Sequence, residues 1–241
     1  MMYIVLVLRS LLCYCMTGVA ALLFFVPCLF VAALTPQKWR FKNRVLFWLL
    51  HGTYQSVRYG FLLRIRFMGN KIPSTPAIIV ANHESSLDIV LLGGLLRAQP
   101  HMWYALNRFF NTPILGFLLR RISISVDQEH PIRAARAVIQ GISIARREHL
   151  SSVLFPEGGR YTDGMIHEFF SGFAMIAKRL GQPVVPVMMR NVGKVYPPGS
   201  FIIRPYPIEV IIGPAFMVHE YDTDEVFVQR VRQWFIDQTV L

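Results

Sequence analysis

The stretch Ala77-Ile78-Ile79-Val80-Ala81-Asn82-His83-Glu84-Ser85-Ser86-Leu87-Asp88 decides how this chain folds and where its chemistry lies. Its first five residues are a continuous apolar run, which is typical of a strand buried on both faces. A histidine stands just after the run, and an aspartate follows that histidine five positions later. A base and a group that orients it could therefore meet where this strand ends.

The contact between His83 and Asp88 depends on where the next helix begins. Side chains five positions apart on one helix point about 140° away from each other, so both residues cannot lie within it and touch. With Ser85 as the N-cap, Asp88 becomes the third helical residue and its carboxylate can bend back to the imidazole. The carboxylate would then hold one ring tautomer while the other nitrogen takes a proton from an alcohol. Alternatively, Ser85 and Asp88 only cap the helix.

A second motif, Phe155-Pro156-Glu157-Gly158-Gly159-Arg160, follows another strand-like run. Its glycines permit positive φ and a close approach of the backbone to a ligand. Arg160 could bind a phosphate through its guanidinium fork, and Glu157 could pair with Arg160 or accept a bond from a substrate hydroxyl. The alternative is a tight turn closed by a surface ion pair, which stabilises little.

From about Leu63 onward, short apolar runs alternate with amphipathic stretches, which predicts an α/β domain. The predicted strands are 63–67, 77–81, 102–105, 122–125, 153–155, 184–189 and 208–212. The predicted helices are 86–97, 132–148, 172–180 and 223–238. The stretch 191–207 is rich in Pro and Gly and is predicted to be a loop that borders a site.

Composition favours a lipid partner. The 241 residues are 54% hydrophobic and only 16% charged, against about 25% charged in an ordinary soluble domain. The net charge is +11 and the pI about 10.0, which favours anionic partners such as lipid headgroups, phosphates or CoA. Nucleic acid is the alternative anion, but the apolar N-terminus and the lack of a recognised binding motif argue against it.

The N-terminal segment predicts a membrane anchor. No charged residue occurs from Ser10 to Leu34, a length that can span a hydrocarbon core. Four cations, a Trp and a Phe follow within 36–44, whereas only Arg9 precedes the segment, so a spanning helix would leave the remaining chain in the cytoplasm. The three cysteines all lie in this segment and are read as small apolar residues.

Two alternatives to a spanning helix stay open. A cleaved signal peptide is one, although its apolar core is usually shorter, about 7–15 residues. A half-inserted helical hairpin is the other, because a second amphipathic helix is predicted immediately after the basic segment. Its apolar stripe consists of Leu46, Leu50, Tyr54, Val57 and Phe61. In either of the tethered forms, residues 1–60 are membrane-anchoring helices and residues 61–241 the catalytic domain.

The two motifs together resemble those of the glycerolipid acyltransferases, the family of 1-acylglycerol-3-phosphate (lysophosphatidate) acyltransferases. Residues 82–88 resemble the family's first, HX4D motif, and residues 155–160 resemble its phosphate-binding motif, usually Phe-Pro-Glu-Gly-Thr-Arg. Residues 109–116 and 185–187 resemble the two other conserved segments in the same order. The resemblance covers roughly residues 60–215.

The resemblance implies a mixed central sheet flanked by helices, with an N-terminal membrane-embedded segment. It implies transfer of an acyl group from acyl-CoA or acyl-carrier protein to a lysophospholipid hydroxyl in phospholipid biosynthesis at the inner membrane, with no cofactor and no metal. His83 would be the general base and Asp88 its partner. The residues expected to bind the acceptor are Asn82, Glu157, Gly158, Gly159 and Arg160. Backbone N–H groups in the turn after the 77–81 strand are expected to stabilise the oxyanion.

This chain departs from the family pattern at one hydroxyl residue and at several cations. Gly159 replaces a Thr, Gln128 replaces an Arg, and Phe170 replaces a Lys. A Lys is also missing from the segment 105–108. The substitute cations available are Arg108, Arg120 and Arg121. The acceptor is therefore left open between lysophosphatidate and another lyso-lipid, including an amino-acid-linked one, and a catalytically inactive lipid-binding protein is the remaining rival.

Overall fold

The computed structural model describes residues 2–239, and within them seven strands form one sheet in the order β1-β7-β6-β2-β5-β3-β4. Every neighbouring pair is parallel except β6 and β7. The strands are β1 Ile65–Gly69, β2 Ile78–Ala81, β3 His101–Leu106, β4 Ser123–Val126, β5 Ser151–Leu154, β6 Val184–Arg190 and β7 Ile208–Ile212. The expected mixed central sheet is confirmed.

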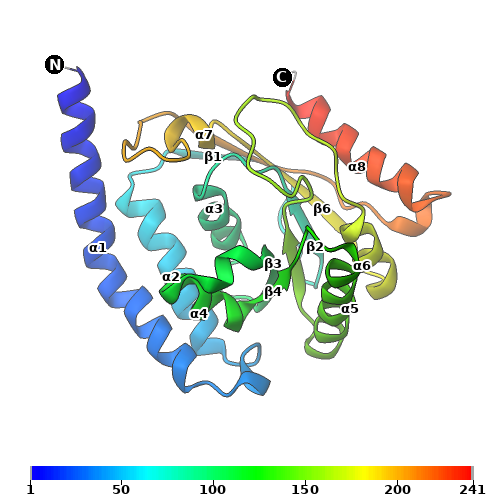
Figure 1. Ribbon diagram of the computed structural model, residues 1–241. Helices are drawn as coiled ribbons and strands as arrows, with labels where there is room; N and C mark the ends of the chain where they lie inside the picture. The colour runs from blue at the N-terminus through cyan, green and yellow to red at the C-terminus, as the bar shows by residue number, and fades with distance from the viewer. Residues whose placement is uncertain (1, 240–241) are drawn as a thin grey trace.

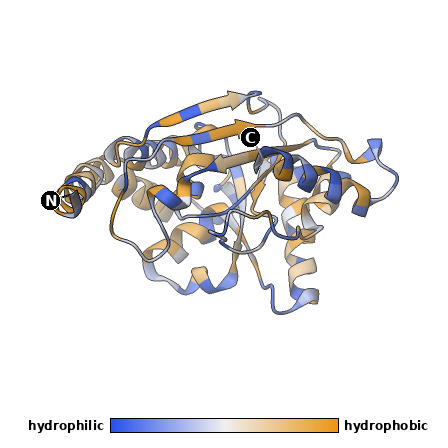
Figure 2. Ribbon diagram, turned by 90° about the horizontal axis from the view of Figure 1, so that it is seen from above, coloured by the Kyte–Doolittle hydropathy of each residue, from blue (hydrophilic) through white to orange (hydrophobic). Residues whose placement is uncertain are grey.

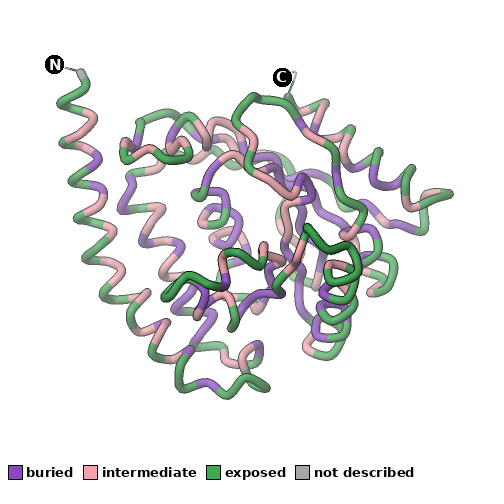
Figure 3. The backbone as a smooth tube through the Cα atoms, in the orientation of Figure 1, coloured by how far each residue is buried: buried purple, intermediate pink, exposed green. Residues whose placement is uncertain are grey.

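Helices cover both faces of this sheet (Figure 1). They are α1 Met2–Leu34, α2 Arg44–Gly60, α3 Leu87–Leu95, α4 Pro113–Ile122, α5 Pro131–Glu148, α6 Gly172–Leu180, α7 Val192–Val195 and α8 Asp224–Thr239. Successive residues of β2 point to opposite faces, as strand geometry requires. Ile78 and Val80 join the core beneath α6 and α8, whereas Ile79 and Ala81 join the core beneath α2 and α3. Figure 3 shows the strands buried between these layers.

The predicted elements agree with the structure to within a few residues. The strand 208–212 and the helix 172–180 match in full, and the other predicted strands shift by one or two residues at their ends. The helix after His83 is shorter than predicted, running over Leu87–Leu95. The prediction missed α4 entirely and missed the short helix α7 inside the 191–207 loop.

Helix α1 lies along α2 at one side of the molecule (Figures 1 and 2). Within the described residues it is the one helix long and apolar enough to cross a membrane, judged by length and composition. Two polar side chains tie it to the rest of the fold: Arg9 donates to the carbonyls of Ile203 and Phe61, and the Tyr14 hydroxyl donates to the carbonyl of Phe201 at 3.0 Å. The helix therefore runs beside the domain instead of projecting from it.

The two predicted units share one hydrophobic core. Leu46 and Leu50 of α2 are buried in the same cluster as Leu92 of α3 and Ile79 of β2. Helix α2 ends at Gly60, where the predicted division lies, but packing continues across it. Helix α2, part of the predicted anchor, is thus an integral layer of the fold.

Candidate active site

His83 lies in the turn between β2 and α3, and its side chain meets that of Asp88. The distance from His83 Nδ1 to Asp88 Oδ2 is 2.8 Å. Asp88 is fully buried, and the histidine side chain keeps 14% of its surface exposed. Because an ionised carboxylate can only accept, Nδ1 carries the proton in this contact and the lone pair of Nε2 is free. The predicted meeting of the two side chains is confirmed; the catalytic role is a prediction that rests on it.

Asp88 also organises the turn. Its Oδ2 accepts hydrogen bonds from the backbone N–H groups of Glu84 and Ser85 at 2.6 and 2.7 Å, in addition to the histidine. The helix begins at Leu87, so Asp88 is its second residue and not the third. The predicted N-cap is one residue too early, because Ser86 holds that position without a side-chain cap bond, and the Asp88 carboxylate both closes the turn and orients the imidazole.

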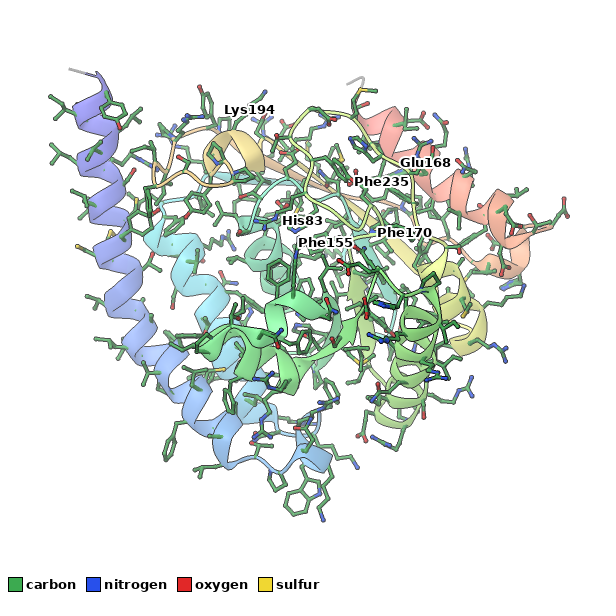
Figure 4. All side chains as sticks on the ribbon, in the orientation of Figure 1. His83, Phe155, Glu168, Phe170, Lys194 and Phe235 are labelled. Carbon is green, nitrogen blue, oxygen red and sulfur yellow. The ribbon has the colours of Figure 1, made fainter. Side chains whose placement is uncertain are left out.

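Aromatic packing fixes the plane of the imidazole. The His83 ring stacks on Phe155 with centroids 4.0 Å apart and planes 11° apart. Trp103 stacks in turn on Phe155 at 6.1 Å. Since Phe155 is the first residue of the second motif, this stacking joins the two motifs at the imidazole, and Figure 4 shows His83 and Phe155 side by side near the centre of the molecule.

The expected oxyanion donors in this turn are already used. The N–H of His83 donates to Glu157 Oε1 at 3.3 Å, and those of Glu84 and Ser85 donate to Asp88. The prediction that backbone N–H groups just after β2 stabilise an oxyanion is wrong for these three. Their hydrogen bonds are already accepted by the buried carboxylates of Glu157 and Asp88.

Glu157 points into the protein and not toward a ligand. It is only 4% exposed, and its second oxygen accepts the backbone N–H of His167 at 3.1 Å. Burial raises its pKa, and the bonds from His167 and His83 partly offset that rise. The structure favours a role for Glu157 in linking the His83 turn to the loop that carries His167, and its contact with the acceptor stays a prediction.

The two glycines of the second motif differ in whether their backbone conformation favours glycine. Gly158 has a φ of +68°, and a Cβ there would lie 2.4 Å from Gln128 Nε2 and 2.5 Å from the Phe170 ring. Gln128 also donates to the Gly158 carbonyl at 3.2 Å. Gly159 has no such backbone need, but the ring of Tyr161 lies 3.1 Å from where its Cβ would be. Tyr161 therefore occupies the space into which a threonine side chain at position 159 would have to fit.

Arg160 is the exposed cation of this motif. Its Nη1 donates to Ser86 Oγ at 3.0 Å, so the guanidinium lies against the first turn after His83. A pocket of about 190 Å³ opens beside it, lined by Ser85, Ser86, Arg160 and the segment from Tyr196 to Phe201. Part of the predicted loop 191–207 thus borders the site as expected.

Asn82 has a different position from the one predicted. Its side chain is 3% exposed and exchanges two hydrogen bonds with the backbone of Met189 in β6, at 2.9 and 2.7 Å. The structure therefore favours a role in joining β2 to β6 over a contact with substrate. Being next to His83, Asn82 fixes where the turn leaves the sheet.

Glu84 is a site residue that the sequence reasoning passed over. Its Oε2 accepts the backbone N–H of Gly193 at 2.9 Å, which ties the His83 turn to α7. Burial raises the pKa of Glu84 to about 7, the Gly193 bond opposes the rise, and the nearby charges of Asp88 and Glu157 add to it. The sequence feature that could have identified Glu84 is its position directly after His83.

The cations proposed as substitutes for the missing ones lie elsewhere. Arg121 donates to the carbonyl of Thr35 just after α1, and Arg120 donates to that of Phe110 just before α4. Arg108 lies over the ring of its neighbour Phe109. None of these contacts is with the Glu157–Arg160 turn, so the suggested compensation at the acceptor site is not seen.

One group of described residues has the spacing to hold a metal ion. Ligand atoms of Asp127, Glu129 and His130 lie within 4.8 Å of one another. Asp127 is already paired with His130 at 3.0 Å and with Arg133 at 3.1 Å, and these partners hold the pKa of its carboxyl below the usual value. The group is explained as an exposed ion-pair network.

Comparison with known proteins agrees with this geometry. The model of the acyltransferase family matches residues 64–190, which include both motifs. The chain belongs to the acyltransferase family. This acyltransferase is 26% identical over 210 residues to a 1-acyl-sn-glycerol-3-phosphate acyltransferase of Pseudomonas aeruginosa, covering 86% of this chain and 80% of that one. It is 24% identical to an enzyme of the same name from Limnanthes douglasii, covering 83% and 75%.

A solved structure shows the same fold. The 1-acyl-sn-glycerophosphate acyltransferase of Thermotoga maritima superposes with a TM-score of 0.79 at 22% identity, covering 99% of this chain and 96% of that one. The match includes the N-terminal helices as well as the sheet. The expected fold class is therefore confirmed over nearly the whole chain.

Proposed function

We propose that this acyltransferase moves a fatty acyl group from a thioester donor, acyl-CoA or acyl-carrier protein, to the hydroxyl of a lysophospholipid in phospholipid biosynthesis. The acceptor we favour is 1-acyl-sn-glycerol-3-phosphate, the substrate named for the relatives from Pseudomonas and Limnanthes. The observation that carries the proposal is the His83–Asp88 contact of 2.8 Å, in the same turn whose Ser86 contacts Arg160 and lines the pocket beside it.

The arrangement supports direct transfer by general-base catalysis. His83 Nε2 takes the proton of the acceptor hydroxyl as the oxygen attacks the thioester carbonyl carbon. Asp88 stabilises the imidazolium that forms, as it already accepts the Nδ1 proton. When the tetrahedral intermediate collapses, the C–S bond breaks and the departing thiolate takes the proton from Nε2. Atoms and charge balance, and His83 returns to its starting state.

Arg160 is the group we assign to the acceptor phosphate. It is exposed, it lies against Ser86 in the turn that carries His83, and a guanidinium can bind phosphate through two parallel bonds. Gln128 and Phe170 border Gly158 on the other side and bring no charge. A single cation at this place leaves room for an amino-acid-linked or other lyso-lipid acceptor, which the assay below separates.

We propose that the protein is held on the cytoplasmic face of the inner membrane by α1. The exposed face of α1 is apolar along its length, and includes Leu8, Leu12, Val19, Leu23 and Phe30. Its opposite face contacts α2 and the loop 196–203. A helix attached to the domain along one side suits partial embedding better than a full crossing, so we favour the half-inserted hairpin among the alternatives.

The direct test is transfer of label from radiolabelled acyl-CoA, and in parallel from labelled acyl-carrier protein, by the purified protein in neutral detergent. The acceptors are lysophosphatidate, lysophosphatidylglycerol, lysophosphatidylcholine and a lyso amino-acid lipid. We expect label in the product of lysophosphatidate, and none with His83→Ala. Label in another acceptor alone would overturn the favoured acceptor. If folded protein transfers no label with any pair of acyl donor and acceptor, the remaining interpretation is a catalytically inactive lipid-binding protein.

A further inference from the structure

A second cavity lies far from the catalytic motifs in the sequence, where the end of α1 meets α4. Its volume is about 540 Å³, and it is lined by residues 33–37 together with Phe117, Arg120 and Arg121. We call it the α1–α4 pocket. It shares no lining residue with the pocket beside Arg160. The acyl-transfer mechanism makes no use of it.

The arginines of the α1–α4 pocket bind carbonyl oxygens instead of carboxylates. Arg121 Nη1 donates to the Thr35 carbonyl at 2.8 Å, and Arg120 Nη1 donates to the Phe110 carbonyl at 2.5 Å. Arg40, which lies next to the pocket and does not line it, donates from Nη1 to the Arg120 carbonyl at 2.6 Å. Among residues 2–239, no carboxylate forms a salt bridge with any of these three arginines. Each guanidinium has five N–H donors, so several remain for a ligand.

The charge around the pocket is almost entirely positive. The connecting segment adds Lys38 and Lys42, and Arg147 lies close enough to Arg40 to repel it. The acid found there, Glu148, is already shared by Lys42 at 3.7 Å and Arg147 at 2.8 Å. Burial, and then repulsion by Arg121 and Arg147, lowers the pKa of Arg40. An anion bound here would relieve that repulsion.

An apolar path leads into the pocket along α1. Val26, Phe30 and Leu34 are 51%, 65% and 68% exposed, and their spacing of four residues places them on one helix face that ends at the pocket. Ile114 and Leu115 on α4 are also exposed, at 58% and 48%. Hydrocarbon chains could lie on this surface while a charged group reaches the arginines. The pattern fits an amphipathic anion better than free phosphate.

We propose that the α1–α4 pocket binds the phosphate headgroup of an anionic membrane phospholipid, as a lipid site separate from the site of acyl transfer. The lipid's phosphate accepts from Arg120, Arg121 and Arg40, and its chains lie along Val26, Phe30 and Leu34. The site secures the enzyme on anionic membrane and is filled by bulk lipid, whether or not substrate is present.

The test compares lipid binding by the full chain and its variants in neutral detergent. Phosphatidylglycerol, phosphatidylcholine or inorganic phosphate is titrated in, and bound lipid is counted by native mass spectrometry. The test variant is Arg120→Gln/Arg121→Gln. The matched control is Arg136→Gln/Arg230→Gln, which removes the same charge from exposed positions on α5 and α8. Arg160→Gln separates this site from the catalytic one.

We expect phosphatidylglycerol to bind Arg120→Gln/Arg121→Gln about 30-fold more weakly than the wild type, from two cations lost at a lipid surface. The control pair and Arg160→Gln should bind as the wild type does, and Arg120→Lys/Arg121→Lys should recover most of the loss. The test variant should keep the wild-type melting temperature in detergent, which shows that it is folded and keeps this result independent of the proposed function.

Three results would overturn the proposal. Equal weakening in the control pair would mean general charge attraction. Equal binding of phosphatidylcholine would mean that the anion is irrelevant. Inorganic phosphate that binds as tightly as the lipid would assign the pocket to a soluble anion.

Discussion

Two turns at the same edge of the sheet, after β2 and after β5, carry the two sequence motifs and use them differently. The strands are adjacent and parallel, so both turns leave at the carboxyl ends, where open α/β sheets place their sites. In the first turn, the side chains of His83 and Asp88 face each other. In the second, Glu157 turns inward to backbone N–H groups while Arg160 turns out toward Ser86.

The difference shows that the hydrogen-bond partner, and not burial, decides what a motif carboxylate does. Asp88 and Glu157 are both buried and both accept backbone N–H bonds. Only Asp88 also bonds a side chain, the imidazole of His83, so it would take part in the proposed chemistry through that partner. Glu157 instead accepts the backbone N–H of His83 and so helps to position that residue. Substitution of His83 should therefore lower the catalytic rate, whereas substitution of Glu157 should lower the stability of the fold.

The largest effect is expected from His83→Ala. Loss of a positioned general base typically lowers the rate by about 10²–10⁴-fold, and we expect kcat to fall within that range. The KM for the acceptor should change little, because Arg160 is untouched. The measurement is the steady-state rate of labelled acyl transfer. A variant that folds normally and keeps wild-type kcat would remove His83 from the mechanism.

Arg160→Gln should act on binding. A hydrogen bond to a charged group contributes about 1.5–3 kcal/mol, so we expect the acceptor KM to rise about 10–100-fold with a smaller change in kcat. Arg160→Lys should recover part of the loss, since it keeps the charge but not the fork. Titrating lysophosphatidate at saturating donor measures this. An unchanged KM in both variants would place the acceptor phosphate elsewhere.

Glu157→Gln should act on stability. The amide oxygen can replace one acceptor, but the amide nitrogen faces a second N–H donor, and one buried bond lost costs about 1–3 kcal/mol. We expect the melting temperature to drop while the acceptor KM of the surviving enzyme stays near that of the wild type. The melting temperature from thermal unfolding in detergent and the acceptor KM from steady-state kinetics are measured on the same variant. A large rise in KM at unchanged stability would restore the substrate role.

The smallest effect is expected from Glu84→Gln, and it depends on pH. The pKa of Glu84 rises from 4.5 to about 7 in the folded protein, so its neutral form is favoured there. The stability linked to this proton is fully present below pH 4.5 and is lost as the pH rises to 7 and above. Gln stays neutral and should be more stable than the wild type at pH 8, by about 1 kcal/mol, and not at pH 4.5. Melting temperatures at the two pH values decide this, and a pH-independent difference would contradict it.

Local pattern was enough to predict the strands and the His83–Asp88 contact. The apolar run before His83 marks a buried strand, and helix geometry leaves one way for the two side chains to meet. The structure bears out both within one residue of the predicted helix start. These features depend on neighbours in sequence, which is why sequence reasoning reached them.

The partners of Glu157, Asn82 and Arg121 could not be predicted in this way. Asn82 bonds Met189 and Arg121 bonds Thr35, in segments distant along the chain. Polar motif residues were assigned to the ligand because nothing in the sequence shows which backbone groups the fold brings to them. The same holds for α1, whose apolar length predicts a membrane helix but not that one face packs on the domain.

The most direct test of the account is a double-mutant cycle on His83 and Asp88. We measure kcat for His83→Ala, Asp88→Asn and the double variant, with folding of each checked by thermal unfolding in detergent. If the carboxylate acts by orienting the base, Asp88→Asn should lower kcat strongly on its own and add almost nothing once His83 is gone. Full additivity of the two losses, or wild-type kcat in either single variant, would contradict the claim that the pair performs acyl transfer as one unit.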